Sequence, residues 1–294
     1  KSLETIFGAV SRWVDPGGAE ITVEVNPEDV DDGLMATLET LPVTRVSVGV
    51  QSMSRSGQRA LGRCAPAVNE RAVGAVRRMF TNFNIDLLLG IPGERAGALT
   101  DTLDRVLDME PPHLSVYCLE PGGVLETQAG PFFEQVDQER AADEYLAVCE
   151  RLRECGYRHY EVSNFAIPGF ESRHNWVYWR GGEYLGIGPG AHSYLAGERF
   201  FNVASIEAYI EGGKAFSGTV RRHNRRDRDE RRLEEIMLAL RTSAGFPADR
   251  LPGGPPAAAD LVQEGLAAVR QGMLVLSDRG FLLLNEIVRR LSGR

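Results

Sequence analysis

The chain has 294 residues, and its 33 basic and 41 acidic side chains give a formal net charge of −8 at pH 7. Hydrophobic residues make up 43% and charged residues 25%, a globular composition that excludes a disordered tail, a collagen-like chain and a coiled coil. The length fits one large domain, with or without a small second one. The acidic balance argues against a protein that coats nucleic acid, because that function needs a basic face.

The cysteines are scattered and form no C-x-x-C pair, so we expect no disulfide framework and a cytoplasmic location. They are Cys64, Cys118, Cys149 and Cys155. No run approaches the roughly 18 apolar residues of a membrane span. The chain begins at Lys1 inside an amphipathic pattern, so we expect that a further segment precedes it in the full protein.

Short apolar runs alternate with helical patterns along the first 200 or so residues. The runs predict strands at 21–25, 45–50, 82–89, 114–119 and 159–164. Helical spacings separate them, as at 99–107 and 145–152. Repeated strand–helix–strand units predict a parallel sheet, in which polar residues at the carboxyl ends of the strands carry the function.

The pattern changes near residue 215, and we expect a second, smaller region from there to the end of the chain. An arginine-rich run at 221–232 admits a nucleic-acid patch, but its interleaved Asp227, Asp229 and Glu230 favour a solvated linker and helix start. Helical patterns then lead to two apolar runs, 273–276 and 281–284, joined by a polar loop at 277–280. Together they predict a hairpin in a winged-helix-like module.

Polar residues at or near the predicted strand ends are the candidate ligand-binding residues. The face that Gln51 shares with Ser47 and Gly49 carries only small side chains, which leaves room for a ligand. A carboxylate such as Asp86 within an apolar strand is costly unless it is paired or binds something. From the residues alone, a ligand site and a structural ion pair stay open as alternatives. The candidates are Glu24, Gln51, Arg63 and Asp86.

Seven sequence blocks, in one order along the chain, resemble the radical S-adenosylmethionine enzymes of the coproporphyrinogen oxidase type. The blocks are 24–28, 45–52, 61–63, 84–93, 160–166, 174–179 and 186–193. The block at 174–179 resembles the haem chaperones of this family more than its oxygen-independent coproporphyrinogen dehydrogenases. The resemblance implies an α/β fold: a partial parallel (β/α) barrel at 1–215 and a small α+β, winged-helix-like module at 216–294.

The resemblance also implies which residues bind the cofactors. Glu24, Gln51, Arg63 and Asp86 match the positions that contact S-adenosylmethionine. A guanidinium suits the methionyl carboxylate, and oxygen acceptors suit the ribose hydroxyls and the ammonium group. His174, among aromatic residues, is implied as a haem ligand. From its neighbours alone, an aromatic core with a satisfied histidine is the alternative.

The family's [4Fe–4S] cluster is held by a C-x3-C-x2-C run, which this chain does not contain. We therefore expect its ligands in a preceding segment and assign no metal ligand within this chain.

Other polar residues receive weaker assignments. His192, at the end of the loop 186–192, is a second haem or substrate candidate. That loop lacks the G-x-G-x-x-G pattern of a dinucleotide site, so we expect a tight turn beside a strand. Glu161 and Asn164 line the same pocket or cap it. His113 and His159 receive no function.

The sequence thus favours a haem chaperone that binds haem and delivers it to haem-requiring proteins. The alternative is an oxygen-independent coproporphyrinogen III oxidase, which uses a 5′-deoxyadenosyl radical made from S-adenosylmethionine. Whether the chain is an enzyme stays open, as do membrane association, homodimer formation and the identity of the haem recipient.

Overall fold

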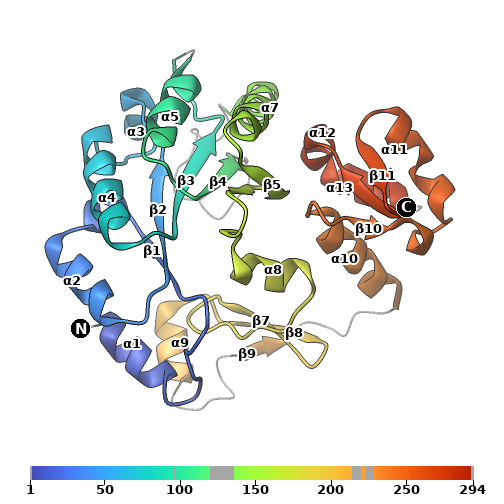
Figure 1. The fold of residues 1–294 in the computed structure, drawn as a ribbon. Coiled ribbons are helices and arrows are strands. Elements are labelled where there is room, and N and C mark those ends of the chain that lie inside the picture. Colours follow the sequence, from blue (N-terminus) through green and yellow to red (C-terminus); the bar gives the residue numbers. More distant parts are fainter. Residues whose placement is uncertain (1, 96, 120–135, 214–219, 223–227, 293–294) are drawn as a thin grey trace. The chain divides into compact units, whose positions relative to one another are not determined.

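The computed structural model describes the chain apart from residues 1, 96, 120–135, 214–219, 223–227 and 293–294 (Figure 1). Contacts within the chain divide it into two compact units, Lys1–Glu171 and Ser172–Arg294. The expected boundary near residue 215 falls within the second unit, and the functional division at that residue stays a prediction. Among the described residues, none of the helices combines the length and apolar character needed to cross a bilayer.

A six-stranded sheet in the order β1-β2-β3-β4-β6-β5 lies at the centre of the first unit. Its parallel strands are β1 (Thr22–Val25), β2 (Arg45–Gln51), β3 (Phe83–Leu89) and β4 (His113–Cys118). These confirm four of the five predicted strands. The fifth is wrong as a single strand, because a turn divides it into β5 (Arg158–Glu161) and β6 (Asn164–Ala166), which pair with each other in antiparallel fashion. β6 also pairs antiparallel with β4.

Helices connect the parallel strands, as the alternating pattern predicts (Figure 1). Polar N-caps begin three helices of this unit: Asp31 accepts a hydrogen bond from the Leu34 amide, Ser54 from the Gly57 amide, and Asp137 from the Arg140 amide. Proline starts α4, where its missing amide hydrogen costs nothing. The helices of the first unit are α1 (Ser2–Val10), α2 (Asp32–Thr40), α3 (Arg55–Ala60), α4 (Pro66–Met79), α5 (Ala98–Leu107) and α7 (Gln138–Glu154).

The sheet has one apolar face and one polar face, because successive side chains of a strand point to opposite sides. The apolar face packs against helices that include α4 and α7. Its fully buried side chains are Val46, Val48, Val50, Phe83, Ile85, Leu87, Leu89, Leu114 and Val116. Burying this many large apolar side chains is the main favourable contribution to the stability of the unit.

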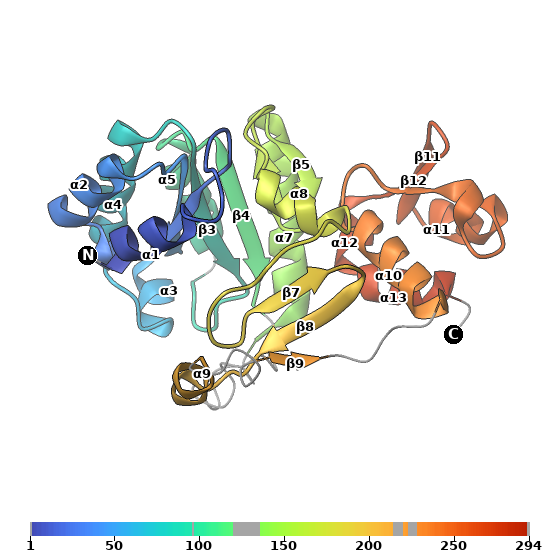
Figure 2. The same ribbon diagram turned by 90° about the horizontal axis from the view of Figure 1, so that it is seen from below.

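The second unit begins with α8 (Arg173–Trp179), which leads to a small antiparallel sheet of β7 (His192–Leu195), β8 (Glu198–Asn202) and β9 (Val220–Arg222), seen in Figure 2. Helix α9 (Ile206–Gly212) separates β8 from β9. The arginine-rich run ends β9 and opens α10 (Arg228–Leu240), while its residues 223–227 lie outside the described part. The last elements are β10 (Phe246–Pro247), α11 (Ala259–Gln263), β11 (Ala267–Arg270), β12 (Met273–Leu276), α12 (Asp278–Leu282) and α13 (Leu284–Leu291).

A hairpin does occur near the C-terminus, but its predicted position is wrong. β12 pairs antiparallel with β11, which precedes it, and not with residues 281–284, which are largely helical. Gln271 and Gly272 both have positive φ angles, +51° and +79°, as a type I′ two-residue hairpin turn requires. Ser277 caps α12 by accepting a hydrogen bond from the Gly280 amide at 3.1 Å. The loop read as a hairpin turn is therefore a helix start.

The α-carbon of Gly280 lies directly against the backbone of Leu266. A β-carbon there would clash with the Leu266 carbonyl oxygen, which already accepts a hydrogen bond from the Ser277 amide, and would lie 3.1 Å from the Leu276 β-carbon. Gly280→Ala should therefore lower the free energy of unfolding by about 1–3 kcal/mol.

Thermal unfolding followed by circular dichroism measures this effect, with Gly8→Ala as the matched helical control. A β-carbon at Gly8, in α1, meets nothing within 4 Å. That substitution should be neutral or stabilising by about 0.5–1 kcal/mol. Equal melting temperatures for Gly280→Ala and the unchanged chain would show that the close approach is relieved at no cost.

Candidate functional site

The polar face of the sheet brings together side chains from all four parallel strands. Glu24, Ser47, Asn84 and His113 occupy one row across the sheet, and Asp86 and Ser115 occupy the next. We use the name polar face for Glu24, Ser47, Gly49, Asn84, Asp86, His113, Ser115 and Tyr117. Two of the expected S-adenosylmethionine residues, Glu24 and Asp86, therefore lie on it.

Asp86 is the most strongly hydrogen-bonded carboxylate of the polar face. The Asn84 amide donates to Oδ1 at 2.7 Å, and the Ser47 hydroxyl donates to Oδ2 at 3.1 Å. Burial raises the pKa of Asp86; hydrogen bonds from Ser115, Asn84 and Ser47 act against that rise, and the charge of Glu24 adds to it. A carboxylate whose ionised form is disfavoured in the free protein is suited to meet a cationic ligand group.

A chain of hydrogen bonds runs from Tyr160 through His113 to Asp86. His113 Nδ1 lies 2.6 Å from Asn84 Oδ1, and its Nε2 lies 2.8 Å from the Tyr160 hydroxyl. Because Asn84 uses its nitrogen to donate to Asp86, its oxygen accepts, and the proton of His113 therefore sits on Nδ1. Burial and the charge of Arg45 hold the pKa of His113 well below its ordinary value, which keeps the ring neutral. His113, to which the sequence assigned no function, thus orients the side chain that holds Asp86.

Burial also raises the pKa of Tyr117, to about 12, with the nearby charges of Asp86, Glu161 and Glu24 contributing. These carboxylates therefore act on a common region around β4.

Arg63 and Gln51 meet the polar face at the carboxyl end of β1. Arg63 Nη1 donates to Asn26 Oδ1 at 2.6 Å and lies 3.8 Å from Glu28 Oε1. Gln51 follows an irregularity in the β2–β3 register and has a φ of +66°. A β-carbon at Gly49 would lie 3.1 Å from the Gln51 amide nitrogen and 3.8 Å from Asn26 Oδ1. The small residue at 49 therefore makes room for the Gln51 side chain to fold back toward Asn26.

This arrangement offers one guanidinium, two carboxylates and an amide at one end of the sheet. Such groups match a ligand with a carboxylate, an ammonium group and ribose hydroxyls. Sequence reasoning missed the supporting residues Asn26, Asn84 and Ser115. Two of them could have been found from the strand pattern. Asn84 lies two residues before Asp86 in β3, and Ser115 two residues before Tyr117 in β4, so each shares a face of the sheet with its neighbour.

The cysteines do not fit an iron–sulfur cluster. All four are free thiols on separate parts of the chain: Cys64 precedes α4, Cys118 ends β4, Cys149 lies within α7, and Cys155 follows it. Among the described residues, no three cysteine sulfurs come close enough to share a metal ion. A cluster needs several thiolates at one place, so this chain does not hold one through its own cysteines.

His174, the expected haem ligand, is an exposed residue of the first turn of α8. The helix starts there because the Ser172 hydroxyl accepts a hydrogen bond from the Asn175 amide at 3.2 Å. The His174 ring meets Tyr178 edge-on, with 4.7 Å between ring centroids, and Tyr178 in turn meets Tyr184 at 4.5 Å. The histidine therefore lies beside aromatic rings and is accessible, which differs from the alternative of a buried core histidine.

His192 and Glu161 are the weaker candidates. His192 is exposed at the start of β7 and stacks on Phe201 with 5.4 Å between centroids. The preceding loop leads into a strand and not a helix, as expected of a tight turn. Glu161 is fully buried at the end of β5 and accepts a hydrogen bond from the Asn164 amide across the β5–β6 turn.

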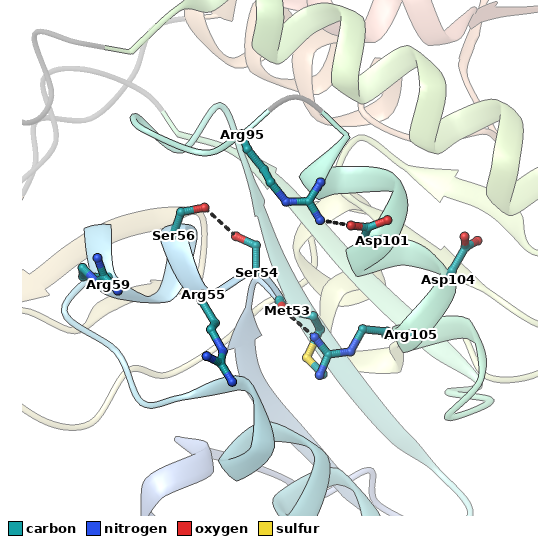
Figure 3. A pocket seen from close by; sticks show the side chains of 9 residues that line it. All are labelled: Met53, Ser54, Arg55, Ser56, Arg59, Arg95, Asp101, Asp104 and Arg105. Carbon is teal, nitrogen blue, oxygen red and sulfur yellow. Dashed lines mark hydrogen bonds and ion pairs between the residues drawn. The ribbon is translucent and has the colours of Figure 1, made fainter.

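A separate cavity of about 700 Å³ lies at the carboxyl end of β2, between α3 and α5 (Figure 3). Figure 3 shows Arg95 directed toward Asp101, and Arg105 toward the carbonyl oxygen of Met53. Arg105 also pairs with Glu70 at 2.6 Å. Since its lining includes none of the four expected S-adenosylmethionine residues, the candidate cofactor site is the polar face and not this cavity.

Comparison with known proteins first defines the class. No protein-family model matches the chain. Its structure is similar to that of coproporphyrinogen III oxidase (HemN) from Escherichia coli, described as a radical SAM enzyme, with a TM-score of 0.80. The match covers 99% of this chain and 74% of that one at 21% identity, so it shows the fold. The chain has the α/β fold of the radical S-adenosylmethionine proteins, as the sequence predicts.

Curated relatives narrow the class to a family. The chain is 34% identical over 290 residues to the protein named "Heme chaperone HemW" from Mycobacterium tuberculosis (strain ATCC 25618 / H37Rv), covering 94% of this chain and 72% of the relative. It is 30% identical over 309 aligned positions to the protein of the same name from Bacillus subtilis (strain 168), covering 98% and 80%. The chain belongs to the HemW family, which confirms the predicted resemblance.

Proposed function

We propose that this chain is a haem chaperone that binds haem through His174 and hands it to a haem-requiring protein. The observation that carries the proposal is the 34% identity to a named haem chaperone over 94% of the chain. The exposed imidazole of His174, beside Tyr178 and Tyr184, supplies the nitrogen ligand and apolar rings that haem binding needs. A cytoplasmic location belongs to the same proposal.

The polar face is proposed to hold S-adenosylmethionine. Arg63 would receive the methionyl carboxylate, and Glu24, Gln51 and Asp86 would share the ribose hydroxyls and the ammonium group. A bound S-adenosylmethionine, together with a reduced iron–sulfur cluster, would supply radical chemistry. Because the cysteines of this chain do not fit a cluster, we limit its own residues to binding and orienting the ligand.

A haemin titration under anaerobic conditions tests the chaperone proposal. The unchanged chain should bind haemin with a shifted Soret band, and His174→Ala should weaken that ligated form about tenfold or more, since it removes the axial nitrogen. His192→Ala is the matched control, because His192 is also exposed and stacks on an aromatic ring. It should leave the spectrum unchanged.

Two outcomes would contradict the assignment. A shifted band that depends on His192 would move the ligand to that residue, and the absence of any shifted band would remove the haem-binding function from this chain. Coproporphyrinogen III consumption in the same preparations tests the oxidase alternative, for which the likeness to the Escherichia coli enzyme provides the fold alone.

A further inference from the structure

The second unit contains a cavity that the haem site described above does not use. Its volume is about 460 Å³, within the range of small-molecule sites. Helix α8, the β7–β8 hairpin, α10 and the turn into β10 provide its walls. The lining includes several aromatic and arginine side chains, among them Trp176, Trp179, Arg180, Tyr194, Arg231 and Phe246.

The cavity and His174 occupy different faces of α8. An α-helix turns by about 100° per residue, so residues three and four apart share a face. Trp176, Trp179 and Arg180 follow that spacing and line the cavity. His174 and Tyr178 are also four residues apart and share a face, but that face lies on nearly the opposite side of the helix from the one that lines the cavity. A ligand in the cavity is therefore bound independently of the His174 imidazole.

Arginine–aromatic stacking surrounds the cavity. Arg180 lies 4.7 Å from the Trp176 ring centre, and Arg199 lies 4.9 Å from that of Tyr194. The remaining pairs are Arg241 with Trp179 at 5.2 Å and Arg250 with Phe246 at 5.4 Å. In every pair the aromatic ring belongs to the cavity wall. These distances fall within the range of cation–π contacts, so the walls present flat surfaces that carry positive charge.

The charges of the lining do not balance. Glu234 pairs with Arg199 at 2.6 Å, and Glu235 pairs with Arg250 at 2.6 Å. Arg180 and Arg231 have no hydrogen-bond or ion-pair partner among the described residues. In the same part of the chain, the indole nitrogen of Trp179 is buried without an acceptor. In a protein of net charge −8, this cavity therefore has two guanidinium groups without an acidic partner, and beside them a donor without an acceptor, among the residues that the structure describes.

We propose that this cavity binds a planar aromatic dicarboxylate, and specifically the propionate-bearing edge of a tetrapyrrole. The aromatic walls would take the ring, and Arg180 and Arg231 would each take one carboxylate. The choice of a tetrapyrrole rests on the proposed function. The negative charge and flat shape of the ligand are inferred from the arginine and aromatic side chains of the cavity alone. The site needs no axial ligand, so it would accept a porphyrin without iron.

Metal-free deuteroporphyrin IX is the probe, because it carries two propionates and no iron for His174 to coordinate. Trp176 and Trp179, which line the cavity, are two of the three tryptophans in the chain, so bound porphyrin should quench intrinsic fluorescence. The double variant Arg180→Gln/Arg231→Gln should bind about tenfold more weakly. The dimethyl ester of the probe should bind the unchanged chain as weakly as the acid binds the double variant.

Two variants serve as controls. Arg270→Gln removes an exposed arginine of the same unit that does not line the cavity, and His174→Ala removes the proposed haem ligand. Both should bind the probe as the unchanged chain does. Equal affinity in the double arginine variant, weakened binding in His174→Ala, or no binding at all would overturn the proposal. The haemin spectrum tests His174 separately, so each proposal fails on its own measurement.

Discussion

Replacing His113 with leucine is expected to lower the free energy of unfolding by about 2–4 kcal/mol at pH 7.5, because buried hydrogen-bonding groups lose their partner. The ring is completely buried and contributes both its nitrogens, one to Asn84 and one to Tyr160. Leucine matches its volume approximately but satisfies neither neighbour. The loss therefore reflects hydrogen bonding more than packing.

The same substitution should change how stability depends on pH. The pKa of His113 is depressed by burial and by Arg45, so the unfolded chain binds a proton there that the folded chain does not. Its contribution to stability is thus complete above the unfolded pKa of about 6.5 and is lost as the pH falls below it, by about 1.4 kcal/mol per pH unit. His113→Leu should flatten the stability profile between about pH 6.5 and 5 by that amount.

Urea unfolding at several pH values measures both effects. His174→Gln is the control, since it removes an exposed histidine outside this hydrogen-bond chain and should leave the free energy of unfolding at pH 7.5 nearly unchanged. If His113→Leu and the unchanged chain lose stability in parallel below pH 6.5, the neutral buried imidazole inferred from the hydrogen bonds is incorrect.

The sequence predicts the sheet well because its strands have a simple hydrophobic pattern. Val46, Val48 and Val50 alternate with Ser47 and Gly49, and β2 indeed buries the valines on the helix-covered face. The same alternation places Asp86 opposite the buried Ile85 and Leu87. One apolar face and one polar face are therefore consequences of period-two patterning that can be read without a structure.

Local turn chemistry explains where that reading fails. Gln271-Gly272 carries no strong turn signal compared with Ser277–Gly280, yet the backbone turns at the former. Ser277 is the N-cap of α12, and helix caps and turns favour the same residue types, so the sequence 277–280 fits both. The turn between β5 and β6 was missed because Tyr160 and Val162 alternate with polar neighbours, a pattern that also fits one continuous strand.

The supporting residues of the site depend on contacts distant in sequence. Asn26 accepts its hydrogen bond from Arg63, which lies 37 residues away in the sequence, and His113 and Asn84, which are hydrogen-bonded to each other, are 29 residues apart. A strand pattern assigns each residue to a face, but the strand register decides which side chains become neighbours. Glu24, Gln51, Arg63 and Asp86 were therefore identified by resemblance, whereas the residues that orient them required the structure.

Asp86→Asn is expected to weaken S-adenosylmethionine binding by about 10- to 100-fold, because a charged acceptor for the ligand is lost. The amide retains the shape of the carboxylate, so the neighbouring Ser47 and Asn84 keep a hydrogen-bonding group beside them. The reduced affinity would then come from the charge and not from a collapsed site.

The substitution should at the same time stabilise the ligand-free protein at neutral pH. The folded pKa of Asp86 is raised, first by burial and further by the charge of Glu24. Its contribution is therefore most favourable below the unfolded pKa of about 3.9 and is lost as the pH rises through the folded value, so the ionised group costs stability at pH 7.5. The amide avoids this cost, and its advantage should shrink as the pH falls.

Calorimetric titration with S-adenosylmethionine measures the affinity. Thermal unfolding from about pH 4 to pH 8 measures the stability, and the difference between the variant and the unchanged chain should be larger at the upper end of this range. Asp108→Asn, an exposed aspartate after α5, is the matched control and should change neither quantity. Weaker binding with a lower melting temperature would indicate that Asp86 mainly holds the sheet together. Unchanged binding with a higher melting temperature would place the ligand away from the polar face. Only weaker binding together with a higher melting temperature fits a carboxylate that lowers the stability of the fold but binds a cationic ligand.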